Sequence, residues 1–477
     1  LHLTGPDGAD PRTQELEVLV FPGPLAVLQT EVQRVSTSGT WDGAYGFALA
    51  NRLRALSAKT GVEVDAKVVR KLQLLAWQRV VRQGRSPDAG VAADLLTALN
   101  GVEGHQLATE MQKRMVRTVE SGQRADGTWA RQTSASLQRV IVQTAYAARS
   151  LPDSSTGARL RAAGALERYA KEVDDPYTAA VVLATGLLES SQSAQLEEVL
   201  LKGIEQGMEG EHRLVTLLPK TENPWGYRPT HSEYLAWVTL ALLHKEGLDW
   251  RGDLVAELME RYDATWGFRA GAADAVALEA IARALPGIDQ PVTVVLTLDG
   301  KEVAKATVDP SQPKVPAVLL AHPSAKNPKI GLRTEQSVPG MAYVMTLHSW
   351  VPWTGKEALA GVDVELDIDP LQVGKDGTIT FQLAAPGGVS VIIEQGIPAG
   401  THVEGFDFGT KSNLQSWDVM TDRVRFETRA LKAGEILEVP LVVRPAFAGQ
   451  YATLPLRVEV EGKHADLAPF TWTIKEG

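Results

Sequence analysis

Carboxylates near predicted helix ends are the first residues of this sequence that could do chemistry. Asp174 and Asp175 precede a predicted helix, and Glu233 and Asp274 lie near predicted turns. Paired carboxylates serve glycosidases as general acid and as base or nucleophile. Helix capping explains Asp175 more simply, because a carboxylate accepts hydrogen bonds from the free N–H groups of a first helical turn. Catalysis by these residues is therefore kept as an alternative hypothesis.

Thiol chemistry is excluded, because the 477 residues include no cysteine. Disulfides, zinc–thiolate sites, iron–sulfur clusters and cysteine nucleophiles are excluded with it. The nine histidines are scattered, and none has the spacing of a zinc site. We expect His231, within Pro229–Glu233, to have a capping or structural role. The sequence predicts neither a metal nor a cofactor.

Length and composition indicate a globular protein of several domains. A chain of 477 residues exceeds the size of one hydrophobic core, and its 44% apolar and 22% charged residues are ordinary values. The net charge of −10 argues against nucleic acid as a partner. No apolar run has the length of about 18 residues that a membrane span needs. Residues 1–5 show neither an initiator Met nor a signal-peptide pattern, so we expect a fragment of a longer precursor.

The elements that must position these residues are helical in the first part of the chain. Up to about residue 288, apolar residues recur at helical spacing. Two such stripes are formed by Leu72, Leu75, Ala76 and Val80, and by Leu235, Val238 and Leu242. We expect about twelve helices between residues 23 and 287. Asp88, Ser154 and Asp175 are the predicted N-caps.

An aromatic residue beside glycine recurs between these helices. It occurs at Trp41-Asp42-Gly43, Asp126-Gly127-Thr128-Trp129, Trp225-Gly226-Tyr227 and Trp266-Gly267-Phe268. Glycine permits a tight turn while the aromatic ring covers a helix end. Repeated helix pairs joined in this way predict an α/α toroid of about six hairpins.

After residue 288 the pattern is that of β-strands. Val292–Leu298 and Lys301–Val308 flank an Asp299-Gly300 turn, which is a hairpin signature. Further predicted strands are Ala342–His348, Val362–Ile368, Thr378–Leu383, Val389–Ile393, Arg423–Thr428 and Leu437–Val443. Short strands separated by turn residues favour β-sandwiches, with a boundary near Val351–Gly355.

One predicted strand, Leu16–Phe21, precedes the helices. The toroid is therefore expected to be inserted between an early strand and the later sheet of one split domain. The predicted fold class is multidomain α+β, with an α/α toroid inserted in a β-sandwich and a second β-sandwich after it.

Five segments, taken in order, resemble the C-terminal part of the α2-macroglobulins, especially the bacterial branch. They are Trp266–Ala280, Ile397–Gly400, Asp422–Phe426, Leu431–Gly434 and Val443–Gly449. The pattern departs afterwards, where Leu454-Pro455 replaces a frequent Pro pair. The resemblance implies a CUB-type β-domain in two parts (residues 1–22 and 289–357), a thioester-type toroid (23–288) and a last macroglobulin-like, receptor-binding-type domain (358–477).

The family's reactive segment reads Tyr-Gly-Cys-x-Glu-Gln, and its Cys and Gln side chains form an internal thioester. The matching segment here is Tyr45-Gly46-Phe47-Ala48-Leu49-Ala50. Phe47 stands at Cys, Leu49 at Glu and Ala50 at Gln. A second register, with Gly43 at the family's Gly, puts Ala44 at Cys and Phe47 at Gln. Neither register allows a thioester, and we expect Tyr45, Phe47 and Leu49 to fill its space and to pack a domain interface.

The resemblance implies part of a bacterial protease inhibitor or trap, located in the periplasm or cell envelope. Capture would be noncovalent, and the expected partners are proteases or envelope proteins, without nucleic acid and without an integral membrane span. We expect no enzymatic activity. Two alternatives stay open: a structural or partner-binding module of an envelope complex, and a toroid enzyme acting on a polysaccharide or isoprenoid through Asp175 or Glu233.

Overall fold

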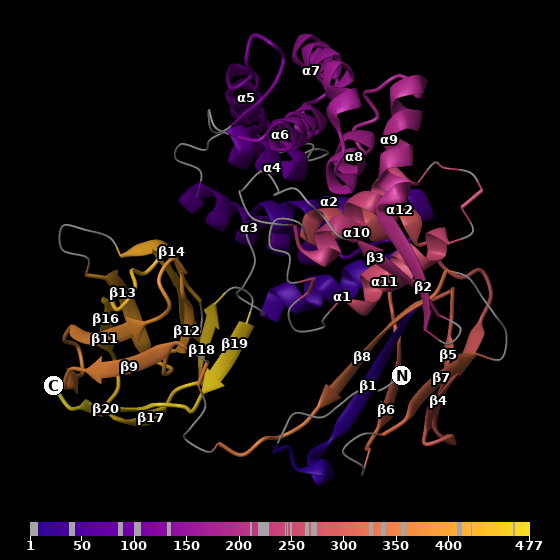
Figure 1. Cartoon of the computed structure of the whole chain (residues 1–477). Helices are drawn as coiled ribbons and strands as arrows, with labels where there is room; N and C mark the ends of the chain where they lie inside the picture. The colour runs from indigo at the N-terminus through magenta and orange to yellow at the C-terminus, as the bar shows by residue number, and fades with distance from the viewer. Residues whose placement is uncertain are drawn as a thin grey trace. The chain divides into compact units, whose positions relative to one another are not determined.

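The computed structural model describes residues 8–477 with several gaps. The gaps are residues 38–42, 84–88, 100–105, 131–134, 210–211, 218–228, 244, 246, 249, 263–266, 269–273, 324–327, 335–339, 354–357, 360, 408–412, 421 and 461–462. The chain divides into two units, Leu1–Trp350 and Val351–Gly477. The described helices all belong to the first unit, whereas the second is built from strands (Figure 1). The chain is thus a mixed helix and sheet protein.

The described part of the first unit contains twelve α-helices, as the sequence predicts. They are α1 (Pro24–Thr37), α2 (Gly43–Thr60), α3 (Ala66–Gln83), α4 (Ala89–Leu99), α5 (Gln106–Ser121), α6 (Leu137–Ser150), α7 (Thr156–Tyr169), α8 (Pro176–Leu183), α9 (Ser190–Lys202), α10 (His231–Ala241), α11 (Arg251–Glu260) and α12 (Asp274–Ala284). None of these helices combines the length and apolar character that a bilayer crossing requires.

The even-numbered helices contact one another in a closed cycle. Helix α2 packs against α4, α4 against α6, α6 against α8, α8 against α10, α10 against α12, and α12 again against α2. Most also pack against the next odd-numbered helix in the chain, as α2 does against α3 and α10 against α11. The six helices of this cycle form what we call the inner ring.

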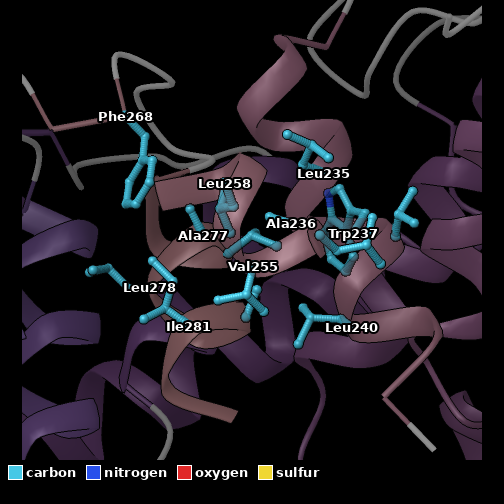
Figure 2. Close-up of a cluster of buried hydrophobic side chains, with 14 of the residues drawn as sticks. Leu235, Ala236, Trp237, Leu240, Val255, Leu258, Phe268, Ala277, Leu278 and Ile281 are labelled. Atoms are coloured by element: carbon cyan, nitrogen blue, oxygen red, sulfur yellow. The ribbon is translucent and has the colours of Figure 1, made fainter. Parts of the chain in front are cut away.

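Two inner-ring helices, α8 and α10, are buried on all sides. In α10, every residue from Ser232 to Leu240 is buried, and in α8 so is every residue from Pro176 to Val182. A helix that is apolar around its whole circumference needs partners on every face. Figure 2 shows such packing, with Leu235 and Trp237 of α10 near Ala277 and Ile281 of α12.

The predicted helix starts are confirmed in one case and wrong in another. Asp175 caps α8, and its carboxylate accepts hydrogen bonds from the backbone N–H of Thr178 at 2.8 Å and from its hydroxyl at 2.7 Å. The N-cap of α7 is Ser155 rather than Ser154, because the helix begins one residue later, at Thr156. The third predicted cap, Asp88, lies outside the described residues.

Of the four aromatic-glycine segments, Asp126–Trp129 lies wholly within the described residues. Trp129 is 3% exposed, and its indole N–H donates to the carbonyl of Val119 at 2.7 Å, so the ring closes the end of α5. The other three segments lie partly or wholly outside the described residues; these are Trp41-Asp42, Trp225–Tyr227 and Trp266.

The helices lie in the chain between strands of one sheet. Strand β1 (Glu15–Phe21) pairs antiparallel with β6 (Ala317–Ala321) on one side and with β8 (Ala342–His348) on the other (Figure 1). The chain also enters and leaves the helical segment at one place. The N–H of Ile288 donates to the carbonyl of Pro22 at 2.8 Å, and a Cβ on Gly23 would lie 3.1 Å from the Cα of Gly287.

A second sheet of the first unit contains the predicted hairpin. Strands β4 (Val292–Leu298) and β5 (Lys301–Val308) have the predicted bounds, and β7 (Ile330–Thr334) pairs with β4. The turn residues Asp299 and Gly300 both have positive φ, 50° and 81°, as the twist of a tight hairpin requires. Alternate residues of β1 and β4 share one apolar cluster, so the two sheets bury their facing sides against each other.

One hairpin within the helical segment was not predicted. Strands β2 (Ile204–Glu209) and β3 (His212–Leu217) pair antiparallel between α9 and α10. These strands are as long as several that were predicted, but β2 has only two apolar side chains besides glycine, Ile204 and Met208, so apolar alternation does not mark it.

The second unit consists of sheets around one apolar cluster, and their strand pairs are antiparallel except for β10 with β20. Its strands are β9 (Asp363–Ile368), β10 (Leu371–Gln372), β11 (Gly377–Ala384), β12 (Ile392–Gly396), β13 (Thr401–Phe406), β14 (Leu414–Val419), β15 (Arg423–Thr428), β16 (Ile436–Pro445), β17 (Gly449–Ala452), β18 (Leu456–Val460), β19 (Lys463–Leu467) and β20 (Thr471–Lys475). Sheets ordered β13-β16-β11-β9 and β14-β15-β12-β18-β19 meet where the rings of Phe381 and Phe426 lie 5.0 Å apart. A short third sheet joins β10, β20 and β17.

Strand β12 is displaced from its predicted position. It spans Ile392–Gly396 rather than the predicted Val389–Ile393. The predicted strand stopped too early because the two residues after Ile393 are polar although they are buried. Glu394 is 6% exposed and lies 3.5 Å from Arg423, and Gln395 is fully buried. Polar side chains buried in a strand conceal it from a search for apolar alternation.

Candidate functional site

The segment matched to the family's reactive site forms the first two turns of α2. The helix begins at Gly43, where any side chain would collide with α3: a Cβ there would lie 2.4 Å from Val80 Cγ2 and 2.7 Å from the carbonyl oxygen of Ala76. Close packing of α2 on α3 therefore requires glycine at the helix start. Because Gly43 lies so close to α3, the residues that follow it in α2 lie among the packed helices.

Phe47, at the position matched to the reactive Cys, is a core residue. It is fully buried and packs edge-on against the ring of Trp77 on α3, with ring centroids 5.0 Å apart. Leu49 and Ala50 are also fully buried, in the neighbouring apolar cluster, while Gly46 is buried and Ala48 partly exposed. These side chains offer neither a nucleophile nor an acyl group.

Tyr45 belongs to a buried polar cluster that the sequence analysis missed. Its hydroxyl donates to the carboxylate of Glu31 on α1, which is fully buried. The same carboxylate accepts a hydrogen bond from the hydroxyl of Tyr262 at 2.7 Å. It also accepts from Nε of Arg34 at 2.8 Å and from Nη2 of Arg34. Burial opposes the charge of Arg34, yet the hydrogen bonds and charge of Glu31 hold the pKa of Arg34 above its usual value. The i,i+3 spacing of Glu31 and Arg34 was the only signal in the sequence.

We expected Tyr45, Phe47 and Leu49 to pack a domain interface, and the contacts described above are internal to the helical layer instead. Tyr45 contacts α1, and Phe47 contacts α3. The reason is the position of α2 in the inner ring, which places these side chains among other helices.

A cavity of about 460 Å³ lies beside the same helical turns. Its lining residues come from five members of the inner ring, α2, α4, α6, α10 and α12, and from the two residues that follow α8. Helix α2 contributes the small residues Ala44, Ala48 and Ala55 together with Tyr45 and Arg52. A stripe of alanines on an inner helix is the sequence signal that could have indicated this space.

Three arginines converge on one carboxylate in the cavity wall. Glu279 of α12 is 5% exposed, and its oxygens lie 2.8 Å from Arg52 Nη2, 2.8 Å from Arg149 Nη2 and 3.2 Å from Arg283 Nη1. Burial alone would raise the pKa of Glu279, but the charges of Arg149 and Arg52 lower it to about 2. The guanidinium of Arg149 also stacks 5.2 Å from the ring centre of Trp237.

Two of the carboxylates named as possible catalytic acids, Asp175 and Glu233, have structural partners and are not among the residues that line the cavity. Asp175 is fully buried as a cap, and Glu233 accepts a hydrogen bond from the hydroxyl of Tyr177 at 2.8 Å. Asp174 precedes this cap, and Asp274 is the first residue of α12. Among the described residues, no three His, Asp or Glu side chains gather as a metal site would require.

His231 is the first residue of α10, but the cap of this helix is Thr230, whose hydroxyl accepts from the N–H of Glu233 at 3.1 Å. Nε2 of His231 lies 3.9 Å from Glu257. Burial and the nearby charge of Arg261 lower the pKa of His231. Its role is thus structural packing at the helix start rather than capping.

Comparison with known proteins identifies the fold. No protein-family model and no curated protein matches the sequence. Solved structures match over 100% of the chain: Salmonella α2-macroglobulin reacted with methylamine (13% identity, TM-score 0.60), a point mutant of Salmonella α2-macroglobulin (14%, 0.61) and Escherichia coli α2-macroglobulin in its native conformation (13%, 0.58). The chain has the fold of part of a bacterial α2-macroglobulin.

The chain covers 33% of each Salmonella structure and 32% of the Escherichia coli one, so it spans about a third of these proteins. The resemblance inferred from the sequence motifs is confirmed at the level of the fold. At 13–14% identity the α2-macroglobulin likeness extends to the fold alone.

Proposed function

We propose that the chain has the domain organisation of an α2-macroglobulin's thioester-type region. Residues 23–288 would form the α/α toroid, inserted between the two parts of a CUB-type domain at 1–22 and 289–357. Residues 358–477 would form a macroglobulin-like domain. The closed cycle of inner-ring helices, the pairing of β1 with β6 and β8, and the contact between Pro22 and Ile288 support this assignment.

We further propose that this region works without a thioester, as part of a noncovalent protease trap. The observation that carries the proposal is the buried phenyl ring of Phe47 against Trp77, at the position matched to the reactive Cys. A ring held between two helices occupies the volume in which a thioester would have to lie. Capture would then depend on movement and docking of domains rather than on acyl transfer.

The proposed setting is the bacterial periplasm or cell envelope, with proteases or envelope proteins as partners and no catalytic role for the chain itself. The fold shared with bacterial α2-macroglobulins supports this setting. Asp175 and Glu233 are engaged in a helix cap and in a hydrogen bond with Tyr177, which disfavours the toroid-enzyme alternative.

Methylamine tests the thioester-free proposal directly. The Salmonella protein, which was crystallised after reaction with methylamine, is the positive control. We expect intact-mass spectrometry to find no adduct on this chain under conditions that modify the control, and a thiol assay to stay negative. A methylamine adduct at any residue of 45–50 would overturn the proposal.

Protease capture is tested by mixing the full-length protein with a panel of proteases and analysing the products with and without detergent. A noncovalent trap should retain protease in native gel filtration and release it intact in denaturing gels. Association with envelope proteins but with no protease would instead favour the structural or partner-binding module.

A further inference from the structure

The cavity of the inner ring has a wall with excess positive charge. Arg52, Arg149 and Arg283 face it, against the two carboxylates of Glu279 and Asp94. Burial lowers the pKa of Arg52, and the charges of Arg149 and Arg283 lower it further, while Glu279 opposes both effects. Three guanidinium groups sharing so few carboxylates favour the arrival of another anion.

Donors in this wall remain available for such an anion. A guanidinium group carries five N–H donors. Within the described part of the chain, Arg52 and Arg283 each contact Glu279 through one terminal nitrogen. Arg149 contacts Glu279 and, through Nε at 3.3 Å, the carbonyl of Ala184. The remaining N–H groups have the planar arrangement that binds carboxylate or phosphate oxygens in pairs.

Apolar side chains make up part of the remaining wall, beside the polar Asn51, Thr97 and Thr185. Ala44, Ala48 and Ala55 of α2 leave space beside the rings of Tyr146 and Trp237. Trp237 is 1% exposed, and its indole N–H has no hydrogen-bond partner among the described residues. A volume of about 460 Å³ falls within the range of pockets that hold small organic ligands.

We propose that this cavity binds a small organic anion whose carboxylate or phosphate pairs with Arg52 and Arg283 and whose apolar body lies against Trp237 and the alanines of α2. The proposal does not depend on the protease-trap function proposed above, although Tyr45 and Ala48 of the segment matched to the reactive site line the cavity. Because residues of five inner-ring helices and the two residues after α8 line it, occupancy of the cavity should stabilise the ring.

The test is titration calorimetry with four probes: benzoate, phenyl phosphate, neutral benzamide and inorganic phosphate. We expect saturable binding of benzoate or phenyl phosphate with a dissociation constant below about 1 mM. Whichever of the two binds more tightly identifies the preferred head group. The indole N–H resonance of Trp237, assigned with Trp237→Phe, should shift on binding.

Two glutamine substitutions on α2 form a matched pair. Arg52→Gln removes a cavity guanidinium, whereas Arg54→Gln removes an exposed one outside the wall, with the same loss of charge. We expect Arg52→Gln to weaken binding about tenfold or more and Arg54→Gln to leave it unchanged. Arg283→Gln replaces Arg52→Gln if circular dichroism shows that the latter is unfolded.

Several results would overturn the proposal. They are the absence of saturable binding to the wild-type chain, equal weakening by Arg52→Gln and Arg54→Gln, and binding of benzamide as tight as that of benzoate. If inorganic phosphate binds as tightly as phenyl phosphate, the phenyl ring adds no affinity, and the proposal of an organic ligand is contradicted. None of these outcomes bears on methylamine reactivity, so the two proposals are tested separately.

Discussion

The buried carboxylate of Glu31 connects the start of α2 to α1, and its removal should lower the free energy of unfolding. It is fully buried and binds two nitrogens of Arg34 and the hydroxyls of Tyr45 and Tyr262. In a Glu31→Ala variant, Arg34 keeps its charge, because guanidinium groups stay protonated in proteins. Since the side chain of Arg34 is only 4% exposed, the variant leaves this cation in the interior without the carboxylate of Glu31.

The expected loss follows from removing the carboxylate that balances this buried cation. Breaking a buried ion pair by removing one partner costs about 3–5 kcal/mol of the free energy of unfolding. Tyr45→Phe removes a single hydrogen bond to a charged acceptor and should cost about 1.5–3 kcal/mol. Glu198→Ala is the matched control, because its ion pair with Lys202 on α9 is exposed at both ends, and it should leave stability unchanged.

Urea unfolding followed by helical circular dichroism is the assay, since the described helices all lie in the first unit. The double variant Glu31→Leu with Arg34→Met should recover much of the loss, because it removes both charges together. If Glu31→Ala shifts the unfolding midpoint no more than Glu198→Ala, the cluster does not hold α1, α2 and Tyr262 together and the reasoning is refuted.

Three other substitutions probe the same helices and the cavity wall, each measured by urea unfolding. Phe47→Ala should cost about 3–5 kcal/mol because the ring is fully buried, whereas Leu160→Ala, at a side chain that is 67% exposed, should change little; equal effects would contradict the core assignment. Glu279→Gln should cost roughly 3 kcal/mol at neutral pH, because the pKa of Glu279 is lowered to about 2 in the folded state from about 4.3 in the unfolded chain. That contribution is present above the unfolded pKa and is lost as the pH falls toward about 2, so the difference from wild type should close over this range, and a pH-independent difference would refute it. Gly43→Ala should cost about 1–3 kcal/mol because its methyl group would collide with α3, while Gly164→Ala, with no atom within 4 Å of the new Cβ, should be neutral or stabilising; reversal of this order would count against the close approach of α2 and α3.

Local patterns predicted much of the fold. The hairpin Val292–Val308 was located to the residue because alternation and an Asp-Gly turn act over a few positions. Likewise, the carboxylate of Asp175 caps α8 as expected, since a cap depends on its next three residues. Turns and helix caps of this kind depend on residues that are adjacent in the sequence.

The site could not be predicted in the same way. Arg52, Arg149 and Arg283 each resemble a solvated surface residue of their own helix, and only closure of the inner ring brings them to Glu279. Tertiary convergence also explains why the role of Tyr45 was missed, because its partner Glu31 lies on another helix. The segment that lacks thioester residues was identified from the sequence, and its side chains were expected to fill the space of the thioester, but their partners Glu31 and Trp77 were not predicted.

The meeting of Pro22 with Ile288 has a consequence for the order of folding. In an unfolded chain, β1 must find β6 and β8 across the whole helical segment, and the entropy cost of closing a loop rises with its length. Once the helices have closed their cycle, both ends of the segment are pinned at Gly23 and Gly287, and the strands become near neighbours. The helices, rich in local contacts, should therefore form first and template the slow, non-local sheet around β1.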